Sequence, residues 1–249
     1  MGPDSQQSHP RPGEGKAAEA TGDAGDGRAE AFRLVAIQAE YRADHSSQHV
    51  ERVADTAAAI AERLGLGTEQ VGLMREAAAL HDVGNLAIPD TILLKPNKLT
   101  EVEYELVKTH TTLGARLLSE SSSPVLQMAS LIAAAHHERW DGTGYPAGLA
   151  GEDIPLVARV VAVADVFDAL THDRPYKSLW PVEQAISEIQ HGAGTQFDPR
   201  VVDAFLETLA RADLAEQTPA PRRGSLFRAP ERRLGGSASQ TPPRPARQA

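Results

Sequence analysis

The chain has 249 residues, enough for one sizeable folded domain, and its 25 basic and 34 acidic residues give a formal net charge of -9. The absence of cysteine excludes disulfide bonds, zinc–thiolate sites and a thiol nucleophile. Residues 31–217 carry 15 basic against 27 acidic residues, and so acidic a body argues against binding of long nucleic acid.

The two ends of the chain have the composition of tails. Residues 1–28 are rich in Gly, Ala, Pro, Ser and Glu, and residues 218–249 hold seven arginines and six prolines, in both cases without sustained apolar periodicity. We therefore predict a disordered N-terminal tail over 1–28, a folded domain over 29–217 and a disordered C-terminal tail over 218–249. No apolar run reaches the roughly 20 residues of a transmembrane helix, and the N-terminus lacks the apolar segment of a secretory signal. A cytoplasmic location is expected.

Between the tails the apolar periodicity is helical. Apolar residues recur every three or four positions over 29–43, 50–64, 71–81, 104–117 and 124–135, and an apolar run covers 156–170. Thr100 and Glu103 form a capping box, and Pro124, Pro181 and Pro199 stand where helices begin. No alternating strand pattern appears, so we predict an all-α fold without significant sheet. The helix over 29–43 is expected to pack on the domain, with pairing to a second copy as the alternative; the oligomeric state stays open.

Histidine and aspartate recur at intervals of about one helix and its connection. The set is His49, His81, His110, the pair His136–His137, and Asp165. Successive helices can each deliver one of these side chains to a shared centre. A single buried histidine is more often a hydrogen-bonded core residue, but five histidines with two aspartates, Asp165 and the Asp82 that follows His81, exceed what core filling explains.

Imidazole and carboxylate ligands without thiolate favour Fe(II), Mn(II) or Ni(II), and less clearly Zn(II). Asp82 directly follows His81, so its carboxylate is placed to bridge two ions. Two ions about 3.5–4 Å apart would lower the pKa of a bridging water and clamp a phosphodiester for in-line attack. The pattern predicts metal-assisted hydrolysis of a phosphate ester.

Five segments between about His49 and Leu206 resemble the HD-GYP family of metal-dependent cyclic di-GMP phosphodiesterases. They are HDVGNLAIPD, KPNKLTEVEYELVKTHTTLGARLL, HHERWDGTGYPAGLAGEDIP, ARVVAVADVFDALTHDRPYK and GTQFDP. The resemblance implies an HD-domain helical bundle with additional HD-GYP helices. It also implies hydrolysis of cyclic di-GMP to linear pGpG by a water that two divalent cations activate, with Fe or Mn first and Ni or Zn as alternatives.

The resemblance assigns a role to each matching residue. One metal would be held by His49, His81, Asp82 and Asp165, and the second by His110, His136 and His137, with Asp82 bridging. The substrate would be contacted by Tyr145 on the rim, by the Asp168 carboxylate in the same cleft, and by Arg174 and Lys177 through its phosphates and guanine.

Two positions depart from the family's pattern. Asn85 stands where the family usually has a lysine that is expected to act at the scissile phosphate, and an amide keeps a hydrogen-bond donor but loses the charge. His45 stands where some members have a glutamate that recruits a third metal, although an exposed residue is the simpler interpretation. Asn85 and the two predicted tails motivate one alternative, a slow or inactive metal-loaded cyclic di-GMP sensor that signals through protein partners. A further alternative is an HD-type hydrolase of another nucleotide, against which the GYP string and the DRPYK segment argue.

Overall fold

The structure is a computed structural model that describes residues 48–172 and 180–217, together with residues 27, 31, 32, 34, 35 and 38. Except for Gly27, which is helical, the predicted tails lie outside the described residues, as do His45, Arg174 and Lys177. The helices are α2 (Gln48–Arg63), α3 (Thr68–Ala78), α4 (Asp90–Leu93), α5 (Glu101–Ser119), α6 (Pro124–Ala135), α7 (Leu156–Thr171), α8 (Val182–His191) and α9 (Pro199–Gln217), with 3-10 turns η1 (Val83–Ala87) and η2 (Gly151–Asp153).

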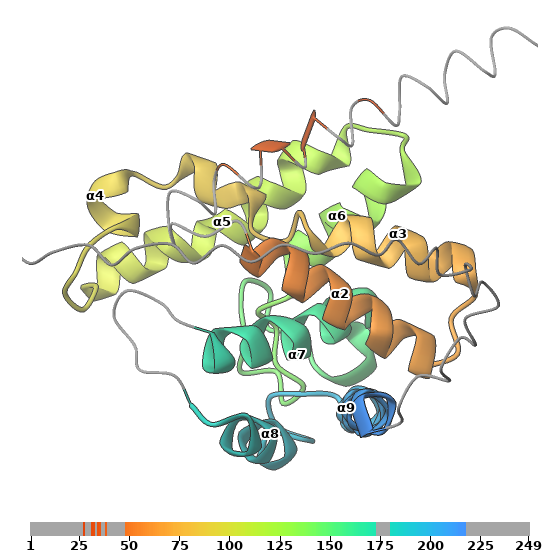
Figure 1. Cartoon of the computed structure of the whole chain (residues 1–249). Helices are drawn as coiled ribbons and strands as arrows, with labels where there is room; N and C mark the ends of the chain where they lie inside the picture. Colours follow the sequence, from red (N-terminus) through yellow and green to blue (C-terminus); the bar gives the residue numbers. More distant parts are fainter. Residues whose placement is uncertain are drawn as a thin grey trace, which may run out of the picture.

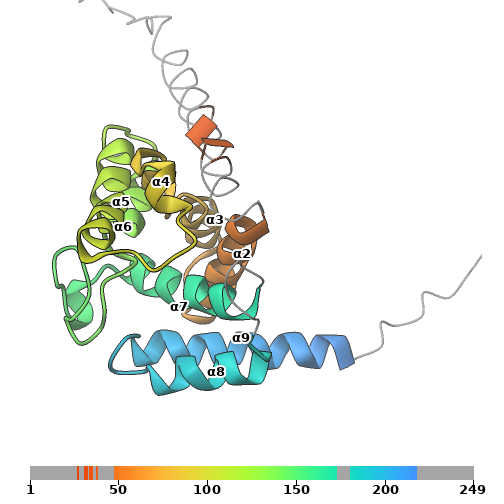
Figure 2. The same ribbon diagram turned by 90° about the vertical axis from the view of Figure 1, so that its left-hand side faces the viewer.

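The predicted all-α fold is confirmed. Within the described ranges no strands pair into a sheet, and an isolated β-bridge joins Ala193 to Phe197. Helices α2 and α7 pack together in the middle of the molecule, between the α5–α6 pair on one side and α8 with α9 on the other (Figures 1 and 2). In the described part of the chain, no helix combines the length and the apolar character needed to cross a membrane.

The packed faces of the central helices carry small side chains. Ala57 and Ala61 of α2, Ala133 of α6 and Ala164 of α7 are fully buried in one apolar core with Val53 and its neighbours. Short side chains let the helix axes approach closely, so residues far apart in sequence meet at the centre. The described residues of the predicted helix over 29–43 are helical, and Phe32 packs against this core.

Helix starts follow the capping signals. The Glu103 amide donates to Thr100 Oγ1 at 3.3 Å and the Thr100 amide donates to Glu103 Oε2 at 2.7 Å, which confirms the capping box of α5. Pro124 and Pro199 are the first residues of α6 and α9, while Pro181 directly precedes α8. These caps set where α5 and α6 begin, and therefore where their histidines lie.

Candidate metal centre

The seven side chains predicted as metal ligands converge in the structure. They come from α2, α5 and α7 and from the turns that follow α3 and α6. They form two groups, Asp82 with His110, His136 and His137, and His49 with His81 and Asp165. Within each group every potential ligand atom lies within 4.8 Å of the others. This distance is short enough for one cation to contact a whole group.

The Asp82 carboxylate lies between the two groups. Its Oδ1 is 3.2 Å from His110 Nε2 and 3.4 Å from His136 Nε2, while its Oδ2 is 3.7 Å from His81 Nε2. In the other group, His49 Nε2 is 3.6 Å from Asp165 Oδ1. One oxygen of Asp82 therefore faces each group.

Three of the imidazoles are oriented by backbone carbonyls a few residues before them. Their Nδ1 atoms donate at 3.0 Å from His81 to Ala78, at 2.7 Å from His110 to Val107, and at 3.0 Å from His136 to Ile132. Because a carbonyl oxygen only accepts, each Nδ1 carries the hydrogen and each Nε2 keeps its lone pair. These Nε2 atoms and Asp82 Oδ1 are buried without a hydrogen-bond partner in the part of the chain that the structure describes. A set of buried acceptors that face one another fits a bound cation.

His49 is oriented instead by Asp168, from α7. Its Nδ1 lies 2.6 Å from Asp168 Oδ2, and Arg52 donates to the same carboxylate from Nε at 2.5 Å and from Nη2 at 2.9 Å. His172 Nδ1 is 3.0 Å from Asp168 Oδ1. Burial opposes ionisation of this carboxyl, but the hydrogen bonds from His49 and Arg52 outweigh it and lower the pKa of Asp168 to about 2.

The structure gives Asp168 protein partners, whereas the sequence predicts a contact with the substrate. The carboxylate is 5% exposed, and both of its oxygens are taken up by His49, Arg52 and His172. Asp168 lies behind His49 and is not among the residues that line the pocket described below. The i,i+3 spacing from Asp165 brings Asp168 to the centre, where it contacts the His49 imidazole, and its contact with the substrate stays a prediction.

Burial and neighbouring charge set the protonation states of the centre. Burial lowers the pKa of His81, and burial together with the neighbouring His136 imidazole lowers the pKa of His137 to about 3. Burial would raise the pKa of Asp82, but the surrounding side chains of His81, His110 and His136 hold it well below its usual value. Ionised carboxylate and neutral imidazole are the forms that bind a cation.

His110 is the exception in this group. Burial lowers its pKa, but the Asp82 carboxylate, 3.2 Å from its Nε2, outweighs burial, so the pKa of His110 is raised. A proton on His110 therefore neutralises part of the carboxylate charge. Cation binding would compete with this proton, which makes the affinity of the centre pH-dependent.

The approach of η1 to α5 requires glycine. A Cβ added to Gly84 would lie 1.9 Å from the backbone oxygen of His110, and one added to Gly114 would lie 3.2 Å from the Gly84 nitrogen. Because no side chain fits at position 84, the turn after His81–Asp82 can lie directly against α5. This contact brings Asp82 next to His110.

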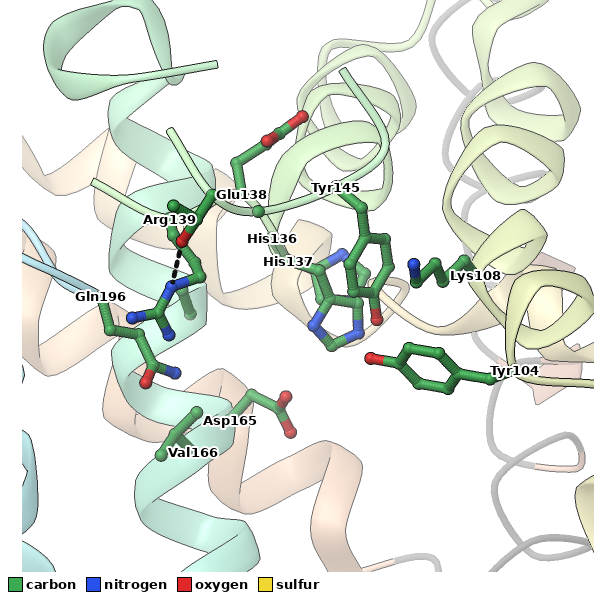
Figure 3. A pocket seen from close by; sticks show the side chains of 13 residues that line it. Tyr104, Lys108, His136, His137, Glu138, Arg139, Tyr145, Asp165, Val166 and Gln196 are labelled. Carbon is green, nitrogen blue, oxygen red and sulfur yellow. Dashed lines mark hydrogen bonds between the residues drawn. The ribbon is translucent and has the colours of Figure 1, made fainter. Parts of the chain in front are cut away.

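A pocket of about 430 Å³ opens beside the centre (Figure 3). His136, His137 and Asp165 reach it from the centre, and the predicted rim residue Tyr145 lines it as well. Tyr104, Lys108 and Gln196 also line it, and the sequence analysis singled out none of them. The sequence signal that could have identified Tyr104 and Lys108 is their i,i+4 spacing, just before the predicted ligand His110 on the same helix.

The loop that carries Tyr145 is held by Glu138, which the sequence analysis also missed. The carboxylate of this buried residue accepts hydrogen bonds from the Ala147 amide at 2.7 Å and the Leu149 amide at 3.1 Å. A Cβ on Gly144 would lie 2.4 Å from the Arg139 nitrogen, so the loop folds back tightly at that residue. The Tyr145 ring then stacks on His137, with centroids 4.9 Å apart and planes 29° apart. The loop is thereby fixed to a predicted metal ligand.

Asn85 lies in η1, and its backbone N–H donates to the backbone carbonyl of Asp82 at 2.9 Å. Its side chain is buried and is not among those that line the pocket. The predicted catalytic contact of Asn85 with the scissile phosphate therefore stays a prediction.

The family model described as HD domain matches residues 33–201. The chain belongs to the HD domain family. Among curated proteins, this HD domain chain is 49% identical over 184 residues (74% of the chain, 49% of the relative) to the cyclic di-GMP phosphodiesterase response regulator RpfG of Xanthomonas campestris. It is 47% identical over 178 residues (72% of the chain, 48% of the relative) to a cyclic di-GMP phosphodiesterase of Thermotoga maritima. It is 43% identical over 168 residues (68% of the chain, 32% of the relative) to the 3'3'-cGAMP-specific phosphodiesterase 2 of Vibrio cholerae.

These relatives confirm the resemblance to the HD-GYP family, although the chain spans about half of their length or less. Two solved structures show the same fold. One is the cyclic GMP-AMP specific phosphodiesterase V-cGAP3 of V. cholerae, with a TM-score of 0.54, 19% identity, and 76% of this chain and 51% of that chain covered. The other is Bd1817 of Bdellovibrio bacteriovorus, described as an HDG"Y"P protein, with a TM-score of 0.51, 22% identity, and 65% and 51% covered.

Proposed function

We propose that this HD domain protein is a metal-dependent phosphodiesterase that hydrolyses cyclic di-GMP to linear pGpG. The observation that carries the proposal is the set of buried Nε2 atoms of His81, His110 and His136, which face Asp82 beside an open pocket. Curated relatives named as phosphodiesterases of cyclic di-GMP and 3'3'-cGAMP support the substrate class. The cytoplasmic location and any signalling partner stay predictions from the sequence.

Two divalent cations would be held by the two groups of side chains. His49, His81 and Asp165 would hold one, and His110, His136 and His137 the other, with one oxygen of Asp82 contributing to each. Bound there, divalent cations supply Lewis acidity that polarises a phosphodiester and lowers the pKa of water. The nitrogen and oxygen donor set favours Fe or Mn, with Ni or Zn as alternatives.

The residues of the chain prepare this centre in three ways. Backbone carbonyls and Asp168 fix the imidazole tautomers, so that Nε2 lone pairs point inward. Residues next to the ligands in sequence, such as Val83 and Ala164, are buried in the apolar core and hold the ligand-bearing segments in place. The loop with Tyr145 forms one wall of the pocket and places an aromatic ring against His137. Arg174 and Lys177, outside the described residues, are proposed to contact the substrate's phosphates.

The test is hydrolysis by the full chain, loaded with Mn(II) or Fe(II) and with its metal content measured by elemental analysis. We expect two ions per chain, conversion of cyclic di-GMP to pGpG on chromatography, and loss of turnover after chelation. A matched control is His191→Ala, which changes an exposed histidine of α8 and is expected to have no effect. No hydrolysis at full occupancy with either metal would contradict the proposal, and 3'3'-cGAMP as a second substrate tests the alternative of another nucleotide.

The rate of turnover depends on Asn85 in this proposal. Replacing Asn85 by Lys adds a positive charge near Asp82 and is expected to raise kcat by about 10²-fold, by analogy with restoring a lost oxyanion donor. Initial rates with cyclic di-GMP measure this effect. A variant with unchanged kcat and unchanged metal content would show that position 85 does not act on the phosphate.

A further inference from the structure

An aromatic side chain on α5 lies open to the pocket. Tyr104 is 47% exposed, and its ring meets the Tyr145 ring edge-on, with centroids 6.5 Å apart and an interplanar angle of 76°. Tyr104 and Tyr145 both line the pocket, and Figure 3 shows them on the same side of it as Lys108. Large apolar rings of this exposure at a pocket wall offer a face on which a planar group can stack.

A cation accompanies these two rings. Lys108 lies one helical turn after Tyr104, and its Nζ is 4.8 Å from the Tyr104 centroid and 5.4 Å from the Tyr145 centroid. The same Nζ donates to Glu105 Oε1 at 2.6 Å. A lysine ammonium carries its positive charge at neutral pH. Glu105 is largely exposed, so its ion pair with Lys108 is weak and can give way to an anionic ligand.

The three side chains are continuous with the metal centre. The Tyr145 ring stacks on His137 and also contacts Tyr104 and Lys108, so it links the two α5 side chains to the metal centre (Figure 3). The other pocket-lining cation, Arg139, is engaged within its own loop, since its Nε donates to Thr143 Oγ1 at 3.0 Å. Among the described lining residues, Lys108 is thus the cation placed beside two aromatic faces.

We propose that Tyr104, Lys108 and Tyr145 form a nucleobase-and-phosphate subsite next to the metal centre. In this subsite a base of the cyclic dinucleotide stacks on Tyr104, and Lys108 pairs with the adjoining phosphate. The inference rests on the proposed function and extends it to residues on α5. Stacking uses the face of a base rather than its edge, so the subsite binds guanine and adenine alike.

The experiment compares KM and kcat of metal-loaded full-length variants for cyclic di-GMP and 3'3'-cGAMP. Tyr104→Ala is expected to raise KM about tenfold for both substrates, whereas Tyr104→Phe, which keeps the ring, stays within about twofold of wild type. Lys108→Gln is expected to raise KM about fivefold and to weaken the dependence of KM on salt. In all three variants kcat and metal content stay close to wild type.

Two controls separate binding from a structural role. Val102→Ala changes a 79% exposed residue at the start of the same helix, and Lys98→Gln removes an exposed charge just before it; neither lines the pocket, and neither is expected to change KM. The subsite is overturned if Tyr104→Ala has the same KM as Val102→Ala, or if it lowers metal content and kcat instead of raising KM. In either case, hydrolysis by the wild type still supports the proposed function. Absence of wild-type hydrolysis overturns the proposed function itself, and the subsite with it.

Discussion

The metal centre holds its imidazoles in two different ways. His81, His110 and His136 donate to carbonyls three or four residues earlier in the chain, whereas His49 is held by Asp168, which is 119 residues away. The first arrangement forms as soon as the local turn forms. The second requires α2 and α7 to be packed together, and it buries a carboxylate that Arg52 must neutralise.

This difference teaches that the two groups of ligands have different weak points. Local hydrogen bonds fix three tautomers without help from the rest of the fold. The orientation of His49 depends instead on the docking of two helices and on a buried ion pair. Removing one partner of such a pair leaves the other charge unpaired, which is costly. Changes at Asp168 should therefore affect one group and spare the other.

The largest effect is expected where the two groups meet. Asp82→Asn removes the carboxylate that faces His81 on one side and His110 and His136 on the other. We expect turnover of cyclic di-GMP to fall by at least about 10³-fold, because charge stabilisation at both ions is lost. Elemental analysis of the variant should show depletion of both ions. Two ions per chain in Asp82→Asn would show that Asp82 belongs to neither group.

A smaller and one-sided effect is expected at Asp168. Asp168→Asn weakens the acceptor of His49 and leaves the three local hydrogen bonds intact, so one ion should be lost before the other, with about 10–100-fold lower affinity for it. Titration with a metal chelator measures the two affinities. Asp55→Asn is the matched control, since Asp55 is an exposed residue of α2 that pairs with Arg75. Equal weakening of both ions would contradict the separation of the two groups.

The free energy of unfolding should depend on pH through His137, whose ring stacks on Tyr145. Its pKa is about 3 in the folded protein and about 6.5 in the unfolded chain, so on acidification the unfolded state takes up the proton first. In metal-free protein, this residue should therefore lower the free energy of unfolding by about 1.4 kcal/mol for each pH unit between 6.5 and 3. His137→Gln should show a shallower decline in urea unfolding between pH 6.5 and 5. An unchanged slope would mean that His137 titrates normally.

The smallest effect is expected at a purely local feature of the same helix that carries His110. Thr100→Ala removes the acceptor of the capping box on α5 and should lower the free energy of unfolding by about 1 kcal/mol. Metal content and KM should not change, because the rest of α5 holds His110 in place. Denaturant unfolding and elemental analysis check both parts. A loss of metal in this variant would show that the local hydrogen bond of His110 depends on the helix start.

Local signals in the sequence determined much of this protein. Thr100 with Glu103 set the start of α5, Pro124 that of α6, and the spacing of the histidines, with the HD-GYP resemblance, selected the seven side chains that meet in the structure. These features could be predicted because caps and helical periodicity act over a few residues. The carbonyls that orient His81, His110 and His136 are equally close in the chain, although the sequence analysis did not predict these hydrogen bonds.

Tertiary structure alone decided how the distant parts meet. The sequence placed Asp168 one turn after Asp165, but only the packing of α7 on α2 turned it toward His49 and Arg52 and away from the pocket. Likewise, Glu138 became the anchor of the Tyr145 loop, and Tyr104 became part of a pocket wall, through contacts that no local pattern records. Periodicity specifies which face a side chain occupies, whereas its partner depends on which helix packs there, and that is set by the whole core.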